Sequence, residues 1–232
     1  MVEIYEVGGC VRDSLLGIKS NDVDYVFISS ESKIQDAFSE MKSWMEANKF
    51  KLFLITEDCV TIRAKFPDSN LVADFVLARK EIGYEQNSRK PICEAGTLYD
   101  DLIRRDFTVN SIARDKNGEL IDFFGGQEDL ALKILRTPKP PELTFNDDPL
   151  RLLRALRFSV KLGFGMAPEI IETIQNFDYQ KMLVVSKERI YEELKKMFEA
   201  DTVSTFEILT EFNALRNYIF STGIKLTPSL KS

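Results

Sequence analysis

The sequence predicts an α+β protein, with a mixed sheet and helices over residues 1–137 and a small all-helical domain over residues 138–232. Two observations support this. Before residue 137, short runs of β-branched and aromatic residues lie between turn residues, which is typical of strands. After it, apolar residues recur at helical spacing. The Pro-rich segment PKPPEL separates the two patterns, so we place the domain boundary there.

The first domain contains five runs with strand character, at residues 3–7, 23–28, 52–55, 59–66 and 71–79. Between the second and third runs, Ile34, Phe38, Met41 and Met45 recur at helical spacing, so we predict an amphipathic helix whose apolar stripe belongs to the core. Residues 100–114 are expected to form one helix that crosses beneath the site. Residues 119–137 are expected to form a last strand-and-helix unit.

The second domain is predicted to contain four helices, at about residues 147–162, 168–176, 186–200 and 203–218. Gly163 is a candidate C-cap of the first helix, and Pro168 a candidate N1 residue of the second. Ser186 is a candidate N-cap of the third.

Composition excludes several kinds of chemistry. The chain has no histidine, which removes histidine bases, Ser-His catalysis and histidine metal sites, so carboxylates and arginines must act instead. Its three cysteines lack the C-x-x-C spacing and indicate a reduced, cytoplasmic protein. No run suits a signal peptide or a membrane span. A net charge of −6 argues against indiscriminate nucleic-acid binding but leaves room for a local basic groove.

The run VGGCVRDSLLG, followed by NDVDYVF, is the most informative feature. Gly8 and Gly9 end an apolar strand and let the backbone approach a ligand, while Arg12 adds a positive fork in the helix that follows. Asp22 and Asp24 alternate with apolar neighbours, so on a strand both carboxylates share one face. A lone Asp-x-Asp is usually turn chemistry or a solvated face. In this order, however, the motifs indicate a phosphate cradle beside paired ligands for divalent cations, the arrangement needed for nucleotidyl transfer.

The segment NDDPLRLLRALRF places arginines on one helical face and leucines on the other. An ordinary solvated face explains such a pattern in many helices. Here Asp148 and Arg151 also form a pair able to recognise the edge of a nucleobase, because a carboxylate accepts from an exocyclic amine and arginine offers a planar fork. Arg154 and Arg157 continue the same face.

These motifs, together with RRDFTVNS at residues 104–111, resemble class II tRNA nucleotidyltransferases, the CCA-adding enzymes, and the bacterial poly(A) polymerases that share their head domain. Both groups belong to the polymerase beta nucleotidyltransferase superfamily. The resemblance covers residues 3–198, which correspond to a nucleotidyltransferase head and a helical neck, and the body and tail of the family are expected to be missing.

The resemblance implies specific roles for residues of this chain. Asp22 and Asp24 would bind Mg²⁺, and Asp74 would supply a third carboxylate. Alternatively, Asp74 is only an outward-facing polar residue of a strand in which polar and apolar residues alternate. The remaining expected roles are triphosphate binding by Gly8, Gly9, Arg12 and Arg105, fixing of the sugar or bracing of the site by Asp106 and Asn110, base selection by Asp148 and Arg151, and support or phosphate contact by Arg154 and Arg157. Phe107, between Asp106 and Asn110, is expected to belong to the core. Residues 79–91 resemble a flexible loop of the family, and residues 186–198 a motif that supports the base-reading helix.

The expected function is addition of CMP and AMP from CTP and ATP to the 3′ end of tRNA. Partial addition of C or A and poly(A) tailing remain open alternatives. A rival of another class is a non-catalytic RNA-binding half of a split enzyme. Because no body or tail is expected, a homo-oligomer or a partner chain would complete the RNA-binding surface.

Overall fold

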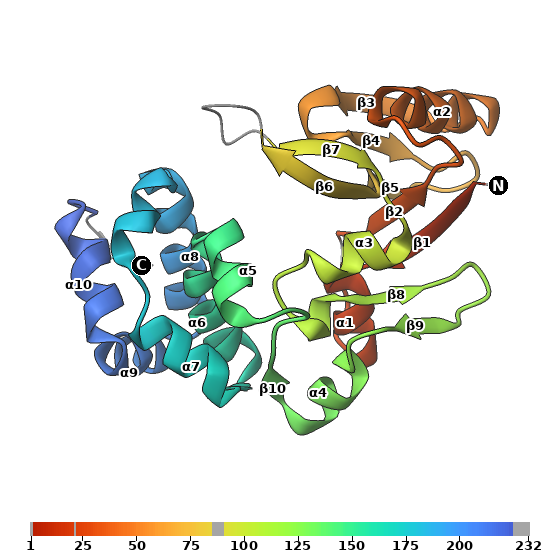
Figure 1. Cartoon of the computed structure of the whole chain (residues 1–232). Coiled ribbons are helices and arrows are strands. Elements are labelled where there is room, and N and C mark those ends of the chain that lie inside the picture. The colour runs from red at the N-terminus through yellow and green to blue at the C-terminus, as the bar shows by residue number, and fades with distance from the viewer. Residues whose placement is uncertain (1, 21, 85–90, 225–232) are drawn as a thin grey trace, which may run out of the picture. The chain divides into compact units, whose positions relative to one another are not determined.

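The computed structural model describes residues 2–20, 22–84 and 91–224 (Figure 1). The chain divides into two compact units, Met1–Leu130 and Ala131–Ser232. The predicted boundary at residue 137 remains a prediction. In the described part of the chain, no helix has the length and apolar character needed to cross a membrane.

The first unit is built on a seven-stranded mixed sheet with the strand order β3-β4-β5-β2-β1-β8-β9. β2 and β5 pair in parallel, and the other neighbouring pairs are antiparallel. The seven strands are β1 (Glu3–Val7), β2 (Asp24–Ile28), β3 (Lys51–Thr56), β4 (Thr61–Lys65), β5 (Val72–Leu77), β8 (Ile112–Arg114) and β9 (Leu120–Asp122). This arrangement confirms the predicted α+β fold with a mixed sheet.

The other elements of the first unit are helices and a separate hairpin. The hairpin joins β6 (Arg79–Tyr84) and β7 (Pro91–Ala95). β6 lies within the segment 79–91 that resembles the family's flexible loop, β7 begins at its last residue, and residues 85–90 between them lie outside the described residues. The helices are α1 (Gly9–Leu15), α2 (Ile34–Ala47), α3 (Leu98–Ile103) and α4 (Gly126–Leu132).

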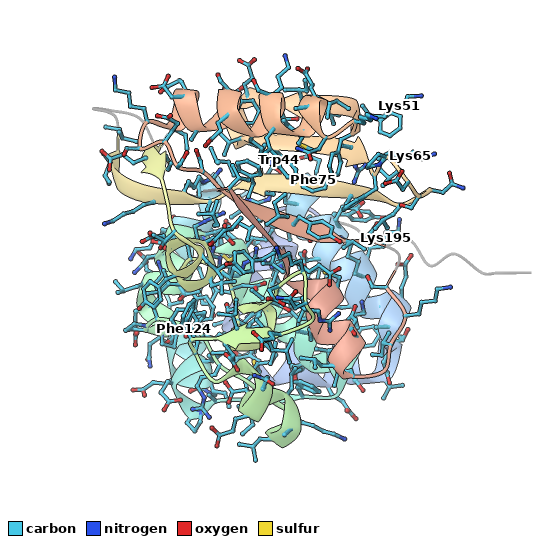
Figure 2. All side chains as sticks on the ribbon, turned by 90° about the vertical axis from the view of Figure 1, so that its right-hand side faces the viewer. Trp44, Lys51, Lys65, Phe75, Phe124 and Lys195 are labelled. Atoms are coloured by element: carbon cyan, nitrogen blue, oxygen red, sulfur yellow. The ribbon has the colours of Figure 1, made fainter. Side chains whose placement is uncertain are left out.

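Helix α2 covers one face of the sheet and makes the main core of this unit with it. Met41 and Met45 are fully buried against Phe27, Ile62 and Phe75, as the helical stripe predicted. Figure 2 shows Trp44 and Phe75 between α2 and the sheet. Each large apolar side chain buried in this way contributes about 1.5–3 kcal/mol relative to exposure.

The prediction of one helix over residues 100–114 is wrong. α3 begins at a capping box formed by Thr97 and Asp100 and ends at Ile103, and a short 3-10 turn, Thr108–Asn110, leads into β8. β-branched residues at 108, 109 and 112 disfavour a continued helix. β8 also pairs with β1 and β9, so long-range strand pairing decides the local structure.

The second unit is helical apart from the short parallel pair of β10 (Ile134–Leu135) and β11 (Gly165–Met166). Its helices are α5 (Pro141–Asp147), α6 (Leu150–Leu162), α7 (Pro168–Gln175), α8 (Lys187–Ala200), α9 (Thr202–Glu211) and α10 (Asn213–Ser221). Gly163 ends α6 with a φ of 65°, Pro168 is at N1 or N2 of α7, and Ser186 caps α8 through its side chain, which confirms the three predicted caps.

Two helix boundaries of this unit differ from the prediction. The helix expected from residue 147 begins at Leu150, because Asp148 precedes Pro149 and adopts an extended backbone, φ −143° and ψ 100°. α5 begins at Pro141, within the Pro-rich segment where the domain boundary was predicted, with a proline in its first turn. The single helix expected over residues 203–218 is broken at Phe212, which belongs to neither α9 nor α10.

Candidate active site

Gly8 links β1 to α1 in a conformation that favours glycine, with φ at +80°. A Cβ at this position would lie 2.7 Å from Nη1 of Arg105 and 4.0 Å from Oδ2 of Asp24. Such an approach is below normal van der Waals contact, so the arginine occupies space that any side chain at position 8 would need. The glycine of the predicted phosphate cradle therefore lies beside one predicted cation and one predicted carboxylate.

Asp24 is the first residue of β2 and pairs with Val7 on one side and Asp74 on the other. Burial raises the pKa of Asp24, Arg105 opposes this shift, and the negative charges of Asp74 and Asp22 add to it. Within the described residues its carboxylate accepts no hydrogen bond. A half-buried carboxylate without a donor, beside two like charges, is stabilised when a cation joins it.

Asp22 lies two residues before Asp24 and is exposed. Carboxylate oxygens are the ligands that Mg²⁺ prefers, so the donor chemistry of this pair fits the ion. Among the described residues, no group of three or more histidine, cysteine, aspartate or glutamate side chains has the arrangement of a metal site. Asp22 and Asp74 both lie near enough to Asp24 for their charges to raise its pKa, and Asp74 differs from the other two in having a counter-charge among the described residues.

Asp74 is held by an arginine from the next strand. Nε of Arg63 donates to Oδ1 of Asp74 at 2.8 Å, and Nη2 donates to Oδ2 at 2.8 Å. This is a two-pronged ion pair, the geometry in which guanidinium and carboxylate match best. Sequence reasoning did not identify Arg63, because only the pairing of β4 with β5 places it opposite Asp74.

Arg105 is oriented by a fully buried carboxylate, Asp101. Nε and Nη2 of Arg105 donate to Oδ2 of Asp101 at 3.0 and 2.8 Å, and Arg104 donates to its other oxygen. Burial alone would raise the pKa of Asp101, but the guanidinium groups of Arg105 and Arg104 hold it below its ordinary value. The i, i+3 and i, i+4 spacing of these residues was a usable signal for this contact.

Arg12 is buried, and its guanidinium makes contacts inside the unit. Nη1 donates to Oδ1 of Asn110 at 2.5 Å, and Nε donates to Oδ1 of Asp13 at 2.8 Å. Asn110 in turn donates to Asp106 at 2.8 Å. These contacts join α1 to the segment after α3, and they fit the expected bracing role of Asp106 and Asn110. Phe107, expected in the core, is fully buried.

The predicted base-reading residues lie in the second unit, at the start of α6. Oδ2 of Asp148 accepts from Nη2 of Arg189 on α8 at 2.8 Å, and Oδ1 accepts from the backbone N–H of Leu150 at 3.2 Å. Nη1 of Arg151 donates to the carbonyl of Thr144 on α5 at 3.3 Å. The residues expected to read a base are thus supported by α5 and α8.

Arg154 and Arg157 share one carboxylate of α8. Arg157 is buried, its Nε donates to Oε2 of Glu193, and it lies 4.1 Å from the ring centroid of Phe158. Nη1 of Arg154 lies 3.7 Å from Oε1 of Glu193. Sequence reasoning did not identify Glu193, which is 36 residues from Arg157. This geometry fits the supporting role expected of the two arginines.

Comparison with known families gives the class of the chain. The poly(A) polymerase head domain family matches residues 4–136. A second family, described as a probable RNA and SrmB-binding site of polymerase A, matches residues 163–220. Because the first match spans more than half of the chain, the chain belongs to the poly(A) polymerase head domain family. This confirms the resemblance seen in the motifs.

Individual relatives are CCA-adding enzymes. A multifunctional CCA protein of Actinobacillus pleuropneumoniae is 34% identical over 228 residues, which are 92% of this chain and 49% of that protein. The Bacillus stearothermophilus CCA-adding enzyme in complex with CTP has a TM-score of 0.74 and 29% identity, over 90% of this chain and 48% of that one. A tRNA nucleotidyltransferase complexed with a primer tRNA and an incoming ATP analog has a TM-score of 0.72 and 30% identity, over 97% and 61%.

The chain spans about half the length of the curated relatives it matches. Nucleotidyltransferases of this class use divalent metal ions. The family membership and the head-domain fold therefore indicate nucleotidyl transfer, and the paired carboxylates are consistent with it.

Proposed function

We propose that this chain is a template-independent nucleotidyltransferase that adds CMP and AMP, taken from CTP and ATP, to the 3′ end of tRNA. The observation that carries the proposal is the state of Asp24, which is half-buried, without a hydrogen-bond donor among the described residues, and next to Asp22, Gly8 and Arg105. Relatives described as CCA-adding enzymes, one of them in complex with CTP, support the substrate.

The proposed reaction joins the 3′ oxygen of the RNA to the α-phosphorus of the nucleotide. The bond from that phosphorus to the α,β-bridging oxygen breaks, pyrophosphate leaves with the electron pair, and the hydroxyl proton passes to solvent. Mg²⁺, when bound, stabilises negative charge on the attacking and leaving oxygens. Asp22 and Asp24 would hold the ions through their carboxylate oxygens.

Other residues of the first unit would orient the triphosphate. Gly8 and Gly9 let the backbone approach the phosphates, and Arg105 presents a guanidinium whose direction is fixed by Asp101. Arg12 contributes by holding α1 against Asn110. A cation fixed before the substrate arrives loses little entropy on binding, so orientation of this kind lowers the activation barrier.

Base selection is assigned to the second unit. Asp148 has a carboxylate able to accept from the exocyclic amine that cytosine and adenine share, and Arg151 has donors for ring nitrogen or carbonyl groups. Arg154 and Arg157, joined to α8 through Glu193, would keep the start of α6 in place. Substitution of Asp148 by alanine is expected to reduce discrimination against UTP and GTP.

The direct test supplies tRNA transcripts ending before C, CC or CCA, with Mg²⁺ and each labelled triphosphate, and reads product length. Addition of all three nucleotides supports CCA addition. A product that stops after C or after A indicates the partial enzymes, and long A tracts indicate a poly(A) polymerase.

Variants separate catalysis from binding. Asp22→Ala and Asp24→Ala are expected to abolish incorporation without unfolding the chain, whereas Asp36→Ala, which removes an exposed acid on α2, is expected to keep full activity. Full activity of either site variant would contradict the assignment. If the unsubstituted chain binds tRNA but incorporates nothing, the non-catalytic half of a split enzyme is the better description.

A further inference from the structure

Arg63, Asp74 and Asp24 form a row across three adjacent strands of the first unit. Arg63 on β4 is directly opposite Asp74 on β5, and Asp74 is in register with Asp24 on β2. Adjacent strands lie about 4.8 Å apart, so Arg63 is two strand spacings from Asp24. The alternate residues Ile62 and Phe75 are buried beneath α2, which places the row on the other face of the sheet.

The two carboxylates of this row differ in their partners. Both oxygens of Asp74 are engaged by the guanidinium of Arg63, at 2.8 Å each. The carboxylate of Asp24 accepts no hydrogen bond from the part of the chain that the structure describes. Each oxygen of Asp74 keeps a further lone pair, but a metal ion bound there would lie close to the positive guanidinium of Arg63, whereas Asp24 has no such ion-pair partner among the described residues. The geometry therefore favours a different role for Asp74.

Arg63 has donor capacity beyond this ion pair. Its side chain is 52% exposed, and Nη1 has no hydrogen-bond partner among the described residues. Guanidinium binds phosphate through the same planar donors that bind carboxylate. With one edge fixed by Asp74, Arg63 presents the rest of its donors in a set direction, which lowers the entropy lost on binding an anion.

The position of Arg63 in the sheet indicates which substrate it would meet. β2, which carries Asp24, lies between β1 and β5. Gly8 and Arg105, assigned to the triphosphate, lie on the β1 side, and Arg63 lies beyond β5 on the opposite side. In an in-line displacement the attacking and leaving groups lie on opposite sides of the reacting phosphorus. The attacking RNA strand would therefore arrive over β5 and β4.

We infer that Arg63 binds a backbone phosphate of the RNA 3′ strand, and that Asp74 is a positioning residue for Arg63 instead of a ligand of Mg²⁺. This inference rests on the proposed function. Lys65, two residues from Arg63 on β4, and its partner Lys51 on β3 extend the positive charge outward from this row. Figure 2 shows both lysines at the same end of the sheet.

The test measures binding, so it needs no turnover. A labelled tRNA transcript ending before CCA is titrated with the chain at several KCl concentrations, and CTP binding is measured separately. Arg63→Ala is expected to weaken RNA binding about tenfold and to reduce the slope of log K against log [KCl] by about 0.7, the value for one contact to a single strand. CTP affinity should change less than twofold.

Two further variants complete the design. Lys42→Ala, which removes an exposed charge from α2 on the opposite side of the sheet, should leave RNA affinity and slope unchanged. Asp74→Asn keeps the shape of the side chain and should weaken RNA binding while leaving Mn²⁺ binding, followed by electron paramagnetic resonance, within twofold. Thermal unfolding of each variant checks that the fold is retained.

Several outcomes would overturn the inference. A tenfold loss of Mn²⁺ affinity in Asp74→Asn would make Asp74 a metal ligand. Weaker CTP binding with normal RNA binding in Arg63→Ala would move the contact to the nucleotide phosphates. Absence of salt-sensitive RNA binding by the unsubstituted chain would also contradict it, whereas RNA binding without any incorporation would contradict only the proposed function.

Discussion

Replacing Asp101 by asparagine tests how the predicted triphosphate-binding arginine is held. Asp101 is fully buried and accepts three hydrogen bonds from Arg104 and Arg105. Asparagine has a similar shape but no charge, and its amide group would point donors at a guanidinium. Breaking a buried ion pair by removing one partner costs about 3–5 kcal/mol. The two arginine side chains are 26% and 21% exposed and regain some hydration, so we expect about 3 kcal/mol.

Urea unfolding followed by tryptophan fluorescence measures this loss. Trp44 is the single tryptophan of the chain and packs on Phe27 at 5.8 Å between ring centroids, so its emission reports the first unit. With a slope of about 2 kcal/mol per M urea, a loss of about 3 kcal/mol shifts the midpoint by about 1.5 M. Asp36→Asn, an exposed acid on α2, serves as the control. A midpoint shift below about 0.5 M for the Asp101 variant would refute the reasoning.

The same ion pairs predict the effect of pH. The pKa of Asp101 is lowered in the folded state, so its contribution is complete above the unfolded value of about 3.9 and is lost as pH falls through the folded value. The difference in stability between the unsubstituted chain and Asp101→Asn should therefore stay constant between about pH 5 and pH 8 and decrease below about pH 4. An increase of this difference on acidification would contradict the assignment.

Two other substitutions give predictions of the same kind. Gly8→Ala should lower kcat/KM for CTP at least tenfold, because the added Cβ would displace Arg105. Gly118→Ala is the control: its φ of +88° gives the same kind of backbone strain, about 1 kcal/mol, but no atom lies within 4 Å of the added Cβ. Equal activity of the two variants would count against the displacement of Arg105. Glu193→Gln leaves two α6 arginines without their carboxylate and should destabilise the helical unit by about 3 kcal/mol, read by far-ultraviolet circular dichroism. A change below 1 kcal/mol would show that these arginines find other partners.

Several parts of the fold that depend on short-range patterns were predicted correctly. The α2 stripe, the cap at Gly163 and the alternation of β5 each depend on neighbours within a few residues. Residues 100–114 were predicted wrongly because their conformation depends on pairing with β1, about a hundred residues earlier. The start of α6 and the end of α9 were misplaced for a different, local reason: Asp148 before Pro149 is extended, and Phe212 interrupts the predicted helix between α9 and α10.

In the candidate site, too, residues that lie close in the sequence could be proposed, whereas partners brought together by packing could not. Sequence spacing was enough to propose Asp22, Asp24 and Gly8, because they lie in one short run, and the family resemblance of RRDFTVNS added Arg105. Neither source could identify which residue opposes each of them. Asp101 was within reach through its helical spacing to Arg105, whereas Glu193 is brought to α6 only by the packing of α8.

Asp24 and Asp74 illustrate why the sequence could not identify the partner of each site residue. Both are aspartates on adjacent parallel strands and face the same side of the sheet, so a sequence pattern assigns them the same role. The pairing of β4 with β5 supplies Asp74 with a fixed counter-charge, and Asp24 receives no equivalent from the described residues. Since a carboxylate already neutralised gains less from a metal ion than one that is not, the division of roles that we infer for these two residues depends on strand register, which residue type alone does not show.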